Sequence, residues 1–176
     1  MKGLLFLVVG NSGSGKDAII EWACNRNPNV THVKRFITRP SSVETEDFVS
    51  VKKEDFKKSD YFLWWESYDK LYGIGKDVIE GLKKGRNYIV NISRDALGDA
   101  KTKWPSSVTV EITAPISLIE ERLSKRGREA EPEVQRRIER AKTAPNVNPD
   151  IVIDGSNSDV SIAGKALLNF IAKKAK

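Results

Sequence analysis

Residues 10–17 read GNSGSGKD, and this stretch decides the fold class of the chain. It follows the continuous apolar run Leu4–Val9. It precedes a segment in which Ile19, Ile20 and Ala23 recur at helical spacing. A buried strand, a glycine-rich turn and a helix, in that order, form the context in which such a loop binds phosphate.

The loop offers an anion both backbone amides and a cation. Gly10, Gly13 and Gly15 can adopt backbone angles that other residues avoid, so that successive N–H groups can point inward around a phosphate. The helix start adds positive partial charge, and Lys16 can reach the terminal phosphates as a point charge. We therefore predict a nucleoside triphosphate site formed by Gly10, Asn11, Ser12, Gly13, Ser14, Gly15, Lys16 and Asp17.

Asp17 departs from the usual pattern of this loop. The pattern G-x-x-x-x-G-K-[ST] ends in a hydroxyl that ligates magnesium, whereas this chain has a carboxylate there. A carboxylate also suits Mg²⁺, directly or through a water. Alternatively, Asp17 only stabilises the first helical turn through its negative charge. We predict Asp17 to be the metal contact.

Composition limits the class of protein. The 176 residues, of which 39% are hydrophobic and 31% charged, suit a globular and soluble chain. No apolar run approaches the ~20 residues of a membrane span, and the single cysteine, Cys24, fits a cytoplasmic protein without an internal disulfide. The net charge of +6 suits nucleic acid or an anionic small molecule. No aromatic residues interleave the arginines of 122–140, as a single-strand groove would need, which favours phosphate chemistry.

Strands alternate with helices along most of the chain, which predicts a three-layer α/β fold around a mostly parallel sheet. The run from Val30 to Thr38 predicts one short strand. The stretch from Phe48 to Gly75 interrupts the alternation and is typical of a β-rich insertion over the strand tips, where substrates bind in such sheets. We expect a single domain with its core at 1–36, 76–113 and 144–176, an acceptor-binding insertion at about 37–75 and a lid at about 122–140.

Arginines are concentrated in the predicted lid. Phosphoryl transfer needs positioning and positive charge more than bond-making side chains. Gly127 separates Arg126 from Arg128, so the two can converge from different directions. Arg136 and Arg140 share a helical face at a spacing of four residues, and Arg137 lies three residues before Arg140. Two arginine-bearing helices joined by a hinge predict a lid over a triphosphate. The alternative is a solvated face with surface ion pairs, which contribute little. The predicted catalytic residues are Lys16, Arg126, Arg128 and Arg137, with Arg140 beside the substrate.

A second set of polar residues is predicted to hold the acceptor. Arginine forks suit bound phosphates, while carboxylates, amides and hydroxyls suit hydroxyl or base hydrogen bonds. Alternatives exist, since Thr38 could be a cap, Tyr72 a core residue and Arg94 solvated. The set follows two strand ends and the insertion: Thr38, Arg39, Glu66, Tyr72, Asn91, Ser93 and Arg94.

The sequence offers no evident general base. His32, the only histidine, lies in an early predicted strand, and we expect it to be structural or exposed. A phosphate acceptor is already anionic near neutral pH and needs no base, which favours transfer onto a phosphate over an alcohol. No Cys/His cluster suggests zinc.

Together these residues resemble the guanylate-kinase-like branch of the P-loop kinases, and within it the ribose 1,5-bisphosphate phosphokinases of phosphonate catabolism. The resemblance runs along nearly the whole chain, and the glycine loop and the lid are its specific parts. The matching motifs are SGSGKD at 12–17, ITR at 37–39, WE at 65–66 with YGI at 72–74, NISR at 91–94, and RL with RGRE at 122–129.

The resemblance implies a kinase that uses ATP and Mg²⁺ and phosphorylates ribose 1,5-bisphosphate to 5-phosphoribosyl 1-diphosphate. True guanylate kinases carry a second arginine and a glycine where this chain has Ser42 and Val43, and a D-x-D where it has Asn91 and Ser93. These differences point away from GMP. A divergent guanylate kinase, a binding module without turnover and a nucleic-acid binder remain as alternatives, and the oligomeric state stays open between a monomer and a homodimer.

Overall fold

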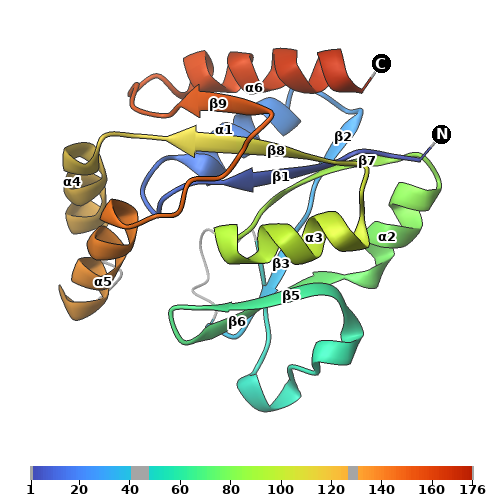
Figure 1. Cartoon of the computed structure of the whole chain (residues 1–176), viewed down its shortest axis with the longest axis horizontal. Helices are drawn as coiled ribbons and strands as arrows, with labels where there is room; N and C mark the ends of the chain where they lie inside the picture. Colours follow the sequence, from blue (N-terminus) through green and yellow to red (C-terminus); the bar gives the residue numbers. More distant parts are fainter. Residues whose placement is uncertain (1, 41–47, 127–130, 176) are drawn as a thin grey trace. The chain divides into compact units, whose positions relative to one another are not determined.

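The computed structural model describes residues 2–40, 48–126 and 131–175. Figure 1 labels the helices and strands along the chain, coloured from blue at the N-terminus to red at the C-terminus. The chain divides into two compact units. The first comprises Met1–Leu7 and Asn29–Ser107, and the second comprises Val8–Pro28 and Val108–Lys176. The boundary between the units crosses the first strand, β1 (Leu5–Val9).

The larger sheet has five strands in the order β2-β7-β1-β8-β9. β2 (Val30–His32) pairs in parallel with β7 (Asn87–Asn91), and β8 (Ser107–Thr113) pairs in parallel with β9 (Ile151–Asp154). All five residues of β1 are fully buried, as expected for a strand of a sheet with both faces covered. This architecture confirms the predicted α/β fold with a mostly parallel sheet.

A second sheet of four strands, in the order β4-β3-β6-β5, lies within the first unit. Its strands are β3 (Arg35–Ile37), β4 (Phe48–Ser50), β5 (Tyr61–Ser67) and β6 (Lys70–Gly75). β5 and β6 form an antiparallel hairpin, and β3 runs antiparallel to β6 and parallel to β4. Two short 3₁₀ turns, η1 (Lys53–Asp55) and η2 (Lys58–Asp60), precede β5.

The single strand predicted from Val30 to Thr38 is wrong, because two strands in different sheets occupy it. The backbone N–H of Val33 still donates to the carbonyl of Ile89 at 2.9 Å, continuing the pairing of β2 with β7. The chain then leaves this sheet and pairs as β3 with β6 and β4. Apolar residues recur through both parts, so hydrophobic periodicity could not show the change of partner.

The hairpin between β5 and β6 turns through two residues with left-handed backbone angles. Tyr68 has φ 51° and Asp69 has φ 59°, which a two-residue type I′ turn requires at both positions. A side chain in this region costs about 1–2 kcal/mol for most residue types, and less for Asp and Asn. Asn-Gly is the pair that fits this turn best.

We therefore expect the double replacement Tyr68→Asn with Asp69→Gly to stabilise the protein by about 1 kcal/mol. Urea unfolding followed by circular dichroism measures the change. Tyr61→Asn, which alters the start of the same hairpin strand without touching the turn, is the control and should not stabilise. An unchanged or lower midpoint for the double variant would show that these side chains contribute at least as much free energy as the turn strain costs.

The helices of the first unit are α2 (Lys76–Lys83), the 3₁₀ turn η3 (Arg94–Ala96) and α3 (Leu97–Lys103). Val78 and Leu82 of α2 are buried, and the helix is followed by Gly85 at φ 84°. The indole N–H of Trp104 donates to the carbonyl of Gly3 at 3.1 Å. This contact joins the chain after α3 to the start of the protein.

The helices of the second unit are α1 (Lys16–Cys24), α4 (Ile116–Arg126), α5 (Glu131–Lys142) and α6 (Val160–Lys174). α1 packs on α6, where a Cβ at Gly164 would lie 2.3 Å from the ring of Trp22. Asp159 caps α6 by accepting from the N–H of Ser161 at 2.9 Å. No helix in the described ranges is long and apolar enough to cross a membrane.

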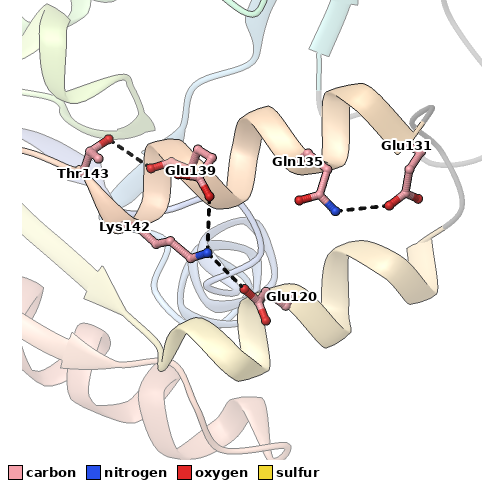
Figure 2. A network of polar contacts seen from close by, with 6 residues as sticks. All are labelled: Glu120, Glu131, Gln135, Glu139, Lys142 and Thr143. Atoms are coloured by element: carbon pink, nitrogen blue, oxygen red, sulfur yellow. Dashed lines mark hydrogen bonds and ion pairs between the residues drawn. The ribbon is translucent and has the colours of Figure 1, made fainter.

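α4 and α5 pack together around a small apolar core of Ile119, Leu123, Val134, Ile138 and Ala141. Figure 2 shows the polar contacts on this helix pair. The ammonium of Lys142 lies 3.3 Å from Glu139 on its own helix and 3.8 Å from Glu120 on α4. These exposed pairs are the surface contacts expected to contribute little, so the apolar core carries the association of the two helices.

Candidate functional site

The glycine loop lies in the second unit, between the end of β1 and the start of α1. A Cβ on Gly10 would lie 2.2 Å from the carbonyl oxygen of Ile112 on β8, so only glycine fits there. Gly15 has φ 92° and is the left-handed residue at which α1 begins. The backbone N–H of Ser14 donates to the carbonyl of Asn11 at 3.1 Å, which closes the turn.

The ammonium of Lys16 lies against the loop that precedes it. Its Nζ donates to the carbonyl oxygen of Gly10 at 2.9 Å and to that of Asn11 at 2.7 Å. The residue is only 9% exposed. An ammonium has three N–H donors, and these two contacts hold the charge beside the loop amides.

Arg137 extends from α5 to the same loop. Its Nη1 donates to the hydroxyl of Ser12 at 2.8 Å, and its Nη2 donates to Oε1 of Glu133 at 2.7 Å. The side chain of Arg137 is 13% exposed and that of Glu133 is 27% exposed. The structure therefore brings together a loop residue and an arginine of α5 that are 125 positions apart in the chain.

Arg122 of α4 donates hydrogen bonds to backbone carbonyls of the glycine loop and of the turn after β9. Its Nη1 donates to the carbonyls of Gly13 at 3.2 Å and Gly155 at 2.9 Å, and its Nη2 to that of Ser156 at 3.3 Å. Gly155 and Ser156 follow β9. The arginine thus ties the loop, α4 and the end of β9 to one another.

The turn after β9 is further ordered by Asp154. Its carboxylate accepts from the hydroxyl of Ser156 at 2.9 Å and from the backbone N–H of Ser156 at 2.8 Å. These hydrogen bonds, with a smaller effect of the charge on Arg122, hold the pKa of Asp154 below its ordinary value. The carboxylate therefore keeps the carbonyl groups of this turn in place for Arg122.

We expect Arg122→Met to destabilise the protein by about 3 kcal/mol, because hydrogen bonds to charged groups contribute about 1.5–3 kcal/mol each and one of the three is long. Equilibrium unfolding in urea measures the loss. Lys125→Met on the same helix is the matched control, since the Lys125 side chain is 75% exposed. Equal stability of the two variants would show that the backbone contacts of Arg122 are not important for folding.

Sequence reasoning identified the loop and Arg137 but missed two residues that hold them. Arg122 stood in the arginine block without an assigned role, because its partners are backbone carbonyls with no sequence signal. Glu133 carries one weak signal, its spacing of four residues before Arg137 on a helix. The contacts of Arg137 with Ser12 and of Arg122 with Gly13 could not be inferred from that spacing.

The structure describes the surroundings of Asp17 and Arg140 but not those of Arg126 and Arg128. Asp17 is exposed in the first turn of α1, where both a metal contact and a helix-dipole effect would place it. Arg140 is half-buried on α5. Arg126 ends α4, and its side chain and the whole of Arg128 lie outside the described residues.

The predicted acceptor residues all lie in the first unit, apart from Arg140. Thr38 continues the pairing of β3 with β6: its N–H donates to the carbonyl of Leu71 at 3.0 Å, and its hydroxyl accepts from the N–H of Leu71 at 2.8 Å. Tyr72 stacks on Trp65 of the paired strand, with ring centroids 5.3 Å apart. Glu66 is exposed, opposite Leu71 in the same hairpin.

Two arginines of the acceptor set are partly buried. The guanidinium of Arg39 lies 4.2 Å from the ring centroid of Phe48, and its backbone carbonyl accepts from the hydroxyl of Ser50 at 2.6 Å. Arg94 begins η3 and is half-buried. Arg94 is therefore not fully solvated, which was the alternative for this residue, and its contact with an acceptor stays a prediction.

Asn91 and Ser93 stand at the carboxyl end of β7. Asn91 is 7% exposed. Ser93 caps η3, since its hydroxyl oxygen accepts from the N–H of Asp95 at 3.4 Å and its hydroxyl donates to the Asp95 carboxylate at 3.1 Å. Asn91 and Ser93 thus place polar groups at the end of β7, and their role in holding an acceptor stays a prediction.

A mostly parallel sheet, a glycine loop with its lysine, and an arginine that contacts this loop from helix α5 together define a P-loop kinase. Comparison with known proteins agrees, since the guanylate kinase family model matches residues 2–174. The chain is 35% identical over 181 residues to the ribose 1,5-bisphosphate phosphokinase PhnN of Psychromonas ingrahamii, covering 99% of this chain and 92% of that protein. It is 31% identical to the enzyme of the same name from Thiobacillus denitrificans, covering 97% and 94% of the two chains.

The chain therefore belongs to the guanylate kinase family and, within it, to the ribose 1,5-bisphosphate phosphokinases. Among solved structures, the guanylate kinase of Anaplasma phagocytophilum shares the fold, with a TM-score of 0.70 at 18% identity over 99% of this chain and 88% of that one. A sugar kinase of Janibacter superposes with a TM-score of 0.58 at 15% identity, covering 97% and 95% of the two chains.

Proposed function

We propose that this kinase transfers the γ-phosphoryl group of ATP to a phosphate of ribose 1,5-bisphosphate, giving 5-phosphoribosyl 1-diphosphate and ADP. The observation that carries the proposal is the pair of cations at the glycine loop, the ammonium of Lys16 on its carbonyls and the guanidinium of Arg137 on Ser12. The choice of ribose 1,5-bisphosphate as the acceptor rests on the names of the relatives.

In the reaction, an anionic oxygen of the acceptor phosphate forms a bond to the γ-phosphorus while the bond from that phosphorus to the β–γ bridging oxygen breaks. Charge accumulates on the transferred group and the leaving oxygen, and fixed cations lower the barrier. Lys16 and Arg137 supply such cations at the loop, and we assign Arg126 and Arg128 the same role. Since the attacking oxygen is already ionised near neutral pH, no general base is needed.

Asp17 is the residue that we propose to hold Mg²⁺, directly or through a water. The exposed carboxylate next to Lys16 suits this ion, which prefers oxygen ligands and retains several waters. When bound, the ion would neutralise charge on the β- and γ-phosphates. The loop amides and Lys16 would orient the same phosphates from the protein side.

The acceptor is proposed to bind the polar residues of the first unit. Arg39 and Arg94 would each hold a phosphate of the bisphosphate through the guanidinium fork. Hydroxyl, amide and carboxylate groups would hold the sugar hydroxyls. The proposed set is Thr38, Arg39, Glu66, Tyr72, Asn91, Ser93 and Arg94, with Arg140 from the lid.

A coupled assay of ADP release with ribose 1,5-bisphosphate, GMP and dGMP in parallel tests the proposal. We expect turnover with the sugar bisphosphate and little with either nucleotide. Turnover with GMP alone would establish a divergent guanylate kinase instead. Failure to bind ATP in the presence of Mg²⁺, measured by calorimetry, would leave a binding module without turnover.

A further inference from the structure

Glu133 lies one helical turn before Arg137 on α5 and holds one side of its guanidinium group. Oε1 of Glu133 accepts from Nη2 at 2.7 Å, while Nη1 of the same guanidinium donates to the hydroxyl of Ser12 at 2.8 Å. The two nitrogens of one planar group thus have different partners, one on the lid helix and one on the glycine loop. This arrangement fixes the plane and direction of the fork.

The partial burial of the pair makes the contact different from the exposed pairs on the same helices. The side chains of Arg137 and Glu133 are 13% and 27% exposed, whereas those of Lys142 and Glu139 in Figure 2 are 47% and 67% exposed. Screening by water weakens the exposed pair. The Glu133–Arg137 pair is less screened, and it orders a side chain that otherwise has many rotamers.

A carboxylate so close to a triphosphate site requires an explanation, because its charge repels phosphate. The explanation is that the Glu133 carboxylate binds Nη2, while the other terminal nitrogen, Nη1, remains bound to Ser12 of the glycine loop. Groups that stabilise a transition state are most effective when they are oriented before the reaction begins. A carboxylate that orients the arginine can therefore accelerate transfer despite its charge.

We propose that Glu133 is a positioning residue for phosphoryl transfer, which directs Arg137 toward the phosphate that the glycine loop binds. This inference rests on the proposed function and concerns a residue that has no predicted role in the sequence analysis. It predicts that Glu133 acts through Arg137 alone. The opposite arrangement, in which Glu133 competes with phosphate for the guanidinium, predicts faster turnover when the carboxylate is removed.

The test measures kcat and the KM for ATP in Glu133→Ala and Glu133→Gln, in the otherwise unchanged protein and with Arg137→Ala. We expect Glu133→Ala to lower kcat by about 10-fold to 100-fold, as small misplacements of reacting groups do, with the KM for ATP within about twofold. Glu133→Gln should recover much of the loss, because its amide oxygen can still accept from Nη2. With Arg137→Ala already present, Glu133→Ala should cause no further loss.

Glu139→Gln, on the exposed part of the same helix, is the matched control and should retain the parent kcat. Thermal unfolding of each variant separates a folding defect from a kinetic one, and Glu133→Gln preserves side-chain volume if Glu133→Ala unfolds. Slow transfer of the γ-phosphoryl group to water, assayed without an acceptor, provides the same comparison independently of the acceptor.

The outcomes distinguish this inference from the proposed function. If Arg137→Ala retains the parent kcat, the role proposed for Arg137 is wrong and Glu133 has nothing to position. If Arg137→Ala is slow while Glu133→Ala is not, or if the two losses multiply, the positioning role alone is wrong. A rise in kcat for Glu133→Ala would show that the carboxylate competes with phosphate. Turnover of GMP alone would show that the proposed acceptor is wrong. The kcat values of the Glu133 variants could then be compared with GMP as the acceptor.

Discussion

Lys16→Met is expected to lower kcat/KM for ATP by about 10²-fold to 10³-fold, the usual cost of removing one preorganised group that stabilises transition-state charge. The Nζ of Lys16 lies 2.9 Å and 2.7 Å from two loop carbonyls, so the loop itself orients this charge. Methionine retains the apolar length of the side chain and removes only the ammonium. The coupled ADP-release assay, run over a range of ATP concentrations, measures the loss.

Lys165→Met is the matched control for this variant, because Lys165 is an exposed residue of α6 in the same unit. It should retain the parent kcat/KM. ATP binding by calorimetry shows whether the lost charge acts on the bound nucleotide or only on transfer. Parent-like turnover by Lys16→Met would contradict the assignment of the glycine loop as the donor site.

Arg137→Ala is expected to lower kcat by about a thousandfold, the lower range for an arginine that stabilises the charge of a transferred phosphoryl group. The guanidinium lies on Ser12 at 2.8 Å and is mostly buried, so no solvent cation replaces it readily. Arg137→Lys should recover only part of the loss, because an ammonium lacks the planar fork that binds two groups at once. Steady-state kinetics at saturating ATP measure both variants.

Arg136→Ala is the control for this second prediction, since Arg136 is the exposed neighbour of Arg137 on α5. It should leave kcat near the parent value. Urea unfolding of Arg137→Ala checks that the fold is retained, because the variant also removes the ion pair with Glu133. A fall in ATP affinity with unchanged kcat would assign Arg137 to ground-state binding instead of transfer.

The sequence predicted the architecture well where the signal was local. The apolar run before residue 10, the three glycines and Lys16 predicted a strand, a turn and a helix start, and the structure has β1, left-handed Gly15 and α1 in those places. Ile116, Ile119 and Leu123 recur at helical spacing in the sequence, and in the structure they lie in or against the core that α4 shares with α5. The division of Val30–Thr38 between two sheets was missed, because strand periodicity does not identify the pairing partner.

Of the candidate site, the glycine loop could be recognised in the sequence because its signal is also local. A phosphate loop uses amides of consecutive residues, so its residues could be read directly from the chain. Arg137 was assigned from the concentration of arginines downstream, yet its contact with Ser12 was not foreseen. Arg122 and Glu133 were left without a role, because their contacts are with backbone carbonyls and with one side of a guanidinium group.

By itself, the sequence determined that this chain is a P-loop kinase, because a glycine turn and a helix start obtain their geometry from neighbouring residues. Only the tertiary structure decided which arginine meets which part of the loop. Arg122 and Gly13 are 109 positions apart, and Arg137 and Ser12 are 125 apart. Contacts at such separations are set by how helices and strands pack, and packing depends on the whole chain instead of any local spacing.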